Sequence, residues 1–80
     1  MSERAENLGR RVELRREAAR LTAECEALRD QLRRALPLVE DVDSLNRDQI
    51  LNTALALNQS LLELDGVNKK IDVLNRELGE

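Results

Sequence analysis

The sequence predicts an all-α fold in which two long amphipathic helices form an antiparallel coiled-coil hairpin and associate further into a helical bundle. Three observations favour this fold. Apolar residues recur at alternating steps of four and three residues in each half of the chain, and a single proline, Pro37, separates the halves. The 80 residues contain no aromatic side chain, while 36% of them are charged. Aliphatic residues at heptad spacing among many charges are typical of long helices packed side by side.

The first helix is expected over about residues 2–36. No glycine or proline interrupts the segment between Arg10 and Leu36, and its many Arg, Glu and Ala residues favour a helix. Its apolar residues form one heptad stripe, or seam, that is expected to pack against a second helix. Toward the N-terminus this seam becomes polar at Asn7 and Arg11. The seam consists of Leu14, Ala18, Leu21, Cys25, Leu28, Leu32 and Ala35.

Residues 37–45 are expected to connect the two helices. Pro37 has no backbone N–H to donate, and its ring disfavours helical angles at the preceding Leu36. The residues that follow are mostly β-branched or short and acidic. A single long helix kinked at Pro37 is the alternative to a hairpin.

The second helix is expected over about residues 46–78 and carries its own start and stop signals. Asn46 is a suitable N-cap with Gln49 three residues later, and Leu45 can pack against Ile50 as a hydrophobic staple. Gly79 suits the end of the helix. The expected seam consists of Ile50, Ala54, Leu57, Leu61, Leu64, Asn68, Ile71, Asn75 and Leu78.

The two expected helices have similar lengths, about 52 Å and about 48 Å at 1.5 Å per residue. Equal helices joined by a short polar linker indicate one antiparallel hairpin domain that covers residues 1–80. Folding the chain at the linker brings the polar ends of both seams together. Asn68 is a candidate for fixing the register, since a buried asparagine often does so in coiled coils. The alternative is a seam that opens to water at Asn68 and Asn75.

The second helix is apolar over more than one stripe. A helix with one partner needs a single stripe, so a wider apolar arc predicts burial against a further helix. The alternative is that the extra leucines cover the linker residues Leu38, Val39 and Val42. The expected protein-interaction residues are Ile50, Leu51, Ala54, Leu55, Leu57, Leu61, Leu62 and Leu64.

Nothing in the sequence supports catalysis. It has no histidine, no tyrosine and no glycine-rich phosphate loop, so we expect no enzyme activity, cofactor, metal or small-molecule substrate. Cys25, the single cysteine, is expected to be a buried small hydrophobic residue, with a redox role as the alternative. An unpaired cysteine favours a reducing compartment, which predicts an intracellular, cytoplasmic protein.

Charge and hydropathy argue against two classes of partner. The net charge is −3, no aromatic residue is present for base stacking, and glutamates alternate with the arginines of the first half, so nucleic-acid binding is not expected. No segment approaches the ~20 apolar residues that span a bilayer, so membrane insertion is not expected. The arginine-rich first half and the acidic second half favour antiparallel pairing with each other.

The function that best fits these observations is that of a non-catalytic coiled-coil scaffold or assembly subunit. Its expected partners are proteins, either further copies of the chain or other helical subunits. The alternative is a regulatory or cochaperone-like helical module that docks on a larger folded protein.

Overall fold

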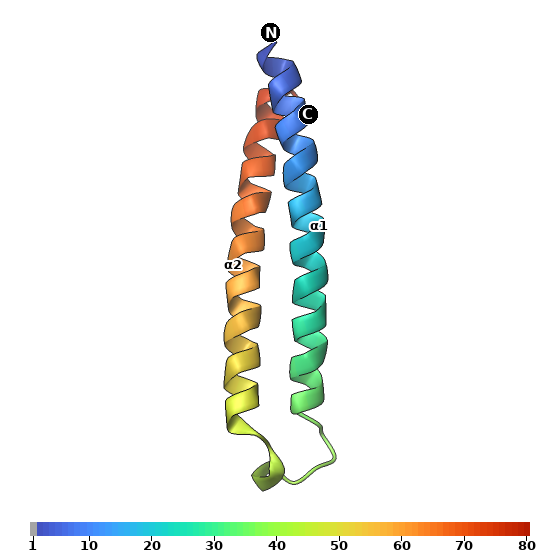
Figure 1. The fold of residues 1–80 in the computed structure, drawn as a ribbon, viewed down its shortest axis with the longest axis vertical. Helices are drawn as coiled ribbons and strands as arrows, with labels where there is room; N and C mark the ends of the chain where they lie inside the picture. Colours follow the sequence, from blue (N-terminus) through green and yellow to red (C-terminus); the bar gives the residue numbers. More distant parts are fainter. Residues whose placement is uncertain (1) are drawn as a thin grey trace.

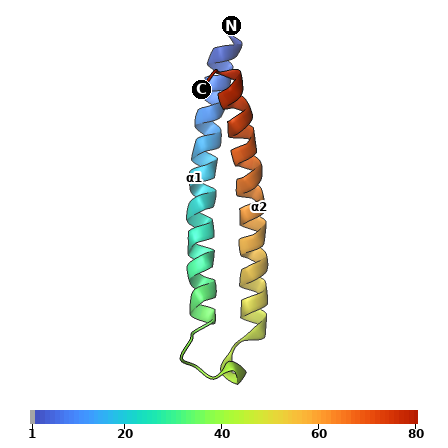
Figure 2. The same cartoon turned by 180° about the vertical axis from the view of Figure 1, so that it is seen from behind.

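A computed structural model, which describes residues 2–80, shows two long helices packed antiparallel along their length (Figures 1 and 2). Helix α1 spans Glu3–Ala35, helix α2 spans Arg47–Glu77, and a short 3-10 helix, η1, spans Val42–Ser44 in the linker. The molecule measures 62 × 16 × 15 Å, with both ends of the chain at the end opposite the linker. This confirms the predicted hairpin and excludes a single helix kinked at Pro37.

The helix boundaries follow from local chemistry. The chain leaves the helical region at Leu36, with φ −124° and ψ 57°, immediately before Pro37. Helix α2 begins after Asn46, whose side-chain oxygen accepts a hydrogen bond of 3.1 Å from the backbone N–H of Gln49. It ends before Gly79, whose φ of 77° lies in the left-handed region that glycine adopts without strain. The sequence signals therefore place both ends of the linker.

The hydrophobic core lies in the half of the hairpin nearer the chain termini. Leu21 has no exposed surface and packs with Val67 and Ile71, which are also buried. Leu14, Ala18 and Leu64 pack around this cluster and are partly buried. Of the other residues expected on the seam of α1, Cys25 is buried and Leu28, Leu32 and Ala35 are half-buried.

The seam of α2 differs from the expected one at every second position. Ile50, Leu57, Leu64, Ile71 and Leu78 are buried or half-buried, as expected. Between them, however, the residues buried against α1 are Thr53, Ser60, Val67 and Leu74. Of the following neighbours, which were expected there, Ala54 and Asn75 are only half-buried and Leu61 and Asn68 are exposed.

The physical reason for this shift lies in the core half of α2. The expected seam would bury Asn68 and Asn75, whereas the observed one buries Val67 and Leu74, and burying an amide costs free energy that burying an aliphatic side chain does not. Asn68 is exposed, so the prediction that it occupies the seam of the hairpin is wrong.

A polar cluster closes the hairpin at the end opposite the linker. Arg11 occupies a seam position, is 9% exposed, and donates a hydrogen bond of 2.9 Å to the side-chain oxygen of Asn75. It also forms an ion pair with Glu80. Arg4 donates a hydrogen bond of 3.1 Å to the backbone carbonyl of Leu78. The half-buried Asn75 therefore has a partner within the hairpin.

The ion pair at this end predicts a pH dependence. The hydrogen bond from Arg11 holds the pKa of Glu80 below its ordinary value of 4.5. A carboxyl whose pKa is lower in the folded state stabilises that state above its unfolded pKa, and the contribution disappears as the pH falls through the folded pKa. We expect Glu80→Gln to lower the urea midpoint slightly at pH 7 and to have no effect at pH values below the folded pKa. An equal difference above and below that pKa would contradict the assignment.

Candidate interaction surface

In the half of α2 nearer the linker, small polar side chains face α1 while several leucines face outward. In an ordinary hairpin the leucines would face the partner helix. Thr53 and Ser60 face α1 and are buried, while Leu51, Leu55 and Leu62 point away and are 58%, 58% and 65% exposed. We call these three residues the outer leucine stripe. A helix whose only partner is α1 would gain more by burying leucines than by burying hydroxyls.

The outer leucine stripe lies on the side of α2 that α1 cannot reach. With Ile50 at heptad position a, the buried residues occupy positions a and d. Leu51 then falls at position b, and both Leu55 and Leu62 fall at position f, directly opposite the seam. No rotamer change within the hairpin can bury all three against α1.

The same segment carries no charge on any face. The 14 residues from Gln49 to Leu62 are all uncharged, between Asp48 and Glu63. By contrast, α1 has charged residues throughout its outward face. An exposed helix face normally carries charged residues, so a face without them is typical of a surface that is buried in an assembly. This run is the clearest sequence signal for the surface.

The structure divides the expected protein-interaction residues into two groups. Ile50, Ala54, Leu57 and Leu64 are half-buried beside α1, and Leu61, at the edge of the seam, is 48% exposed. The outer leucine stripe forms the second group, on the opposite face.

The leucines of α2 do not cover the linker. Leu38, Val39 and Val42 are 101%, 95% and 83% exposed, so the alternative in which the leucines shield these residues does not hold within the hairpin. The linker instead adds three exposed aliphatic side chains to the molecule at the end where the outer leucine stripe begins. Many exposed apolar side chains at one end of a molecule usually mark a contact with another molecule.

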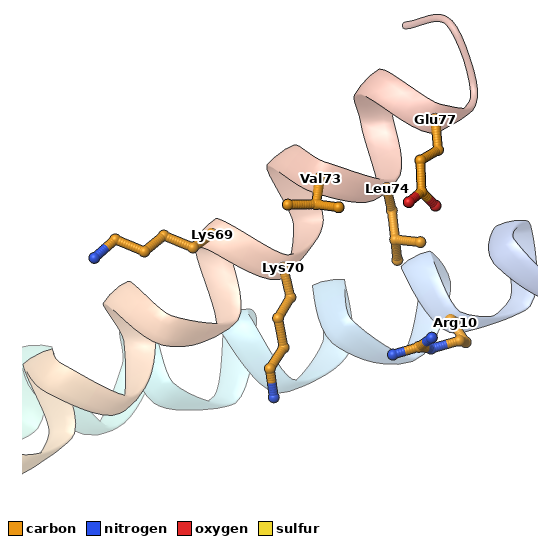
Figure 3. Close-up of a pocket in the computed structure, with 6 residues that line it drawn as sticks. All are labelled: Arg10, Lys69, Lys70, Val73, Leu74 and Glu77. Atoms are coloured by element: carbon orange, nitrogen blue, oxygen red, sulfur yellow. The ribbon is translucent and has the colours of Figure 1, made fainter.

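A shallow groove of about 270 Å³, which the sequence did not predict, lies at the other end of the hairpin (Figure 3). Arg10 contributes to it from α1, and the remaining residues come from α2. Val73 is 44% exposed and Leu74 is buried, so the groove is apolar at its base and basic at its edges. It is lined by Arg10, Lys69, Lys70, Val73, Leu74 and Glu77.

Two kinds of feature are not found within residues 2–80. No group of three or more His, Cys, Asp or Glu side chains in this part of the chain is arranged to hold a metal ion. None of the described helices combines the length and apolar character that crossing a bilayer requires. Cys25 is a free, buried thiol within the hairpin.

Comparison with protein-family models, curated proteins and solved structures finds no match to this chain.

Proposed function

We propose that this protein is a non-catalytic helical assembly subunit that self-associates through the outer face of α2. The observation that carries the proposal is the outer leucine stripe, since Leu51, Leu55 and Leu62 are exposed while Thr53 and Ser60 are buried on the inner face. A second copy presents the same stripe, so the two faces are equivalent and can form a two-fold interface.

The small core supports self-association. Within residues 2–80, the structure has one cluster of buried hydrophobic residues, formed by Leu21, Val67 and Ile71. A domain of this size seldom gains more than ~3–5 kcal/mol from one core. Chains that lack disulfides and metals commonly gain their remaining stability from oligomerisation.

The exposed area points in the same direction. The hairpin exposes 6232 Å². A compact monomer of the same mass exposes about 4,900 Å², so the excess is about 1,300 Å². A standard interface buries about 800 Å² on each partner, so the chain has enough surplus surface to form one.

The first test is the mass of the purified protein by light scattering over a hundredfold range of concentration. We expect a dimer, or a higher even-numbered oligomer, for the wild type. Leu55→Gln/Leu62→Gln is expected to shift this equilibrium toward monomer by about a hundredfold or more, since each leucine loses ~1.5–3 kcal/mol of burial. Glutamine has a helix propensity similar to that of leucine, so α2 should remain helical.

Val12→Gln is the matched control, because Val12 is a similarly exposed aliphatic residue, at 48%, but lies on α1. Its mass should equal that of the wild type. A wild-type protein that stays monomeric at every concentration would overturn the proposal. In that case, the stripe would belong to a contact with a different, larger protein, as in the regulatory or cochaperone-like alternative.

A further inference from the structure

The outer line of α2 is chemically self-complementary. The f positions of this helix, which lie opposite α1, are occupied in order by an acid, two leucines and two bases: Asp48, Leu55, Leu62, Lys69 and Arg76. All five residues are exposed. The ammonium group of Lys69 lies 2.9 Å from the carboxylate of Asp65, but both side chains are largely exposed, so this pair contributes little and can exchange partners.

This order favours one orientation of a second copy. If two α2 helices pack antiparallel with their midpoint between Asn58 and Gln59, Leu55 of each lies level with Leu62 of the other. The same register places Asp48 level with Lys69, so opposite charges face each other at both ends of the leucines. In a parallel arrangement acids would face acids and lysines would face lysines, which is unfavourable.

The antiparallel register also brings the linker of one copy to the groove of the other. Counting outward from the midpoint, Arg47 at the start of α2 lies level with Lys70 of the opposite α2, and the linker extends beyond this end of the helix toward the level of the groove (Figure 1). The groove at that level has Val73 and Leu74 at its base, with the basic groups of Arg10 and Lys70 beside them (Figure 3).

The linker and the groove match in charge as well as in polarity. The linker carries Glu40, Asp41 and Asp43 and no base, and its Val42 is 83% exposed. The groove contributes three bases and one acid around an apolar base. A volume of about 270 Å³ lies just below the ~300–1,000 Å³ found for small-ligand pockets, which suits a few aliphatic side chains better than a large ligand.

We infer that a second copy of this chain packs antiparallel along the outer face of α2 and seats its acidic, apolar linker in the basic groove formed by Arg10, Lys69, Lys70 and Val73. This inference rests on the proposed self-association and adds its orientation and its second contact. Each linker–groove contact occurs twice in such a dimer, because the two-fold axis repeats it.

Orientation is tested by disulfide cross-linking. Asp48→Cys and Lys69→Cys are made as separate proteins in a Cys25→Ala background, one of them with a longer tag, and each is first checked by light scattering. After mixing and mild oxidation, we expect the mixed disulfide between the Asp48→Cys and Lys69→Cys proteins to dominate on a non-reducing gel. Each protein oxidised alone should give little cross-linked product. Dominant homodimeric disulfides, or a dimeric mass without mixed disulfide, would overturn the inference while leaving self-association intact.

The linker–groove contact is tested by charge exchange in the full chain. Asp41→Lys/Asp43→Lys reverses the linker, and Arg10→Glu/Lys70→Glu reverses the groove without changing Lys69, which faces Asp48 in the same register. Each is expected to weaken self-association by about tenfold or more at low salt, and the effect should shrink as salt is added. Mixing the two proteins should restore association to near the wild-type level, because one linker–groove contact in the mixed dimer then joins two reversed partners and the other joins two native ones.

Arg16→Glu/Arg20→Glu is the control for net charge, since it reverses two exposed bases on α1. It should leave association nearly unchanged. If the linker and groove variants associate as the wild type does, or if mixing them restores nothing, the linker does not occupy the groove. If the wild type is monomeric in the light-scattering experiment, the proposed self-association itself is overturned.

Discussion

Leu21→Ala is expected to destabilise the hairpin by about 2–5 kcal/mol, the range observed when a leucine in a packed core is truncated to alanine. Leu21 has no exposed surface and contacts the cluster that includes Val67 and Ile71 on the opposite helix. A core in a domain of this size supplies only ~3–5 kcal/mol, so this single change removes most of the available stability.

The expected result is a large loss of helical circular dichroism at low protein concentration, with a urea midpoint shifted far below that of the wild type. Neighbouring side chains cannot fill the space easily, because Leu14, Ala18 and Leu64 already surround the site. Alanine itself favours a helix, so the loss would come from packing and not from a change in the propensity of α1.

Leu61→Ala provides the matched comparison, since it is the same substitution at a residue that is 48% exposed. Its effect on the hairpin should be about 1 kcal/mol, in proportion to the smaller buried area. If Leu21→Ala unfolds at the same urea concentration as Leu61→Ala, Leu21 does not lie in the hydrophobic core.

The first helix and the ends of the linker were predictable because their signals are local. The apolar residues of α1 form a single stripe, so only one face can turn inward, and Leu21 and Cys25 are buried on it. Pro37 and the Asn46 cap each act within a few residues of the chain. Local chemistry of this kind needs no knowledge of the partner helix.

The seam of α2 was not predictable from spacing alone. Steps of four and three from Ile50 describe two equally regular heptad frames, one through Leu61 and Asn68 and the other through Ser60 and Val67. The choice depends on the whole helix, because α2 turns as a rigid body. Burying Val67 and Leu74 near the termini therefore carries Thr53 and Ser60 inward near the linker.

The groove could not be predicted because it joins residues far apart in the sequence. Arg10 lines it together with Lys70 and Val73, more than half the chain away. Their proximity depends on the register of the hairpin, which the polar cluster around Arg11 and Asn75 reveals only in three dimensions. The sequence alone shows nine arginines on the first helix, and it does not show which of them lies beside Lys69 and Lys70.

The stability of the wild type is expected to depend on protein concentration. If dimerisation accompanies folding, mass action raises the melting temperature as the concentration rises. A two-fold interface buries two copies each of Leu55 and Leu62, and each leucine contributes ~1.5–3 kcal/mol when fully buried. The interface can therefore contribute as much free energy as the hairpin core, and a large part of the measured stability would belong to the contact between copies.

Leu55→Gln/Leu62→Gln should consequently melt at a lower temperature than the wild type, and its melting temperature should not change between micromolar and hundred-micromolar protein. Scanning calorimetry at several concentrations measures both quantities, and Val12→Gln should behave as the wild type does. If the melting temperature of the wild type is constant over this range, folding of the hairpin does not depend on association. The buried hydroxyls of Thr53 and Ser60 would then have to be tolerated by the isolated hairpin, with its leucines left in water.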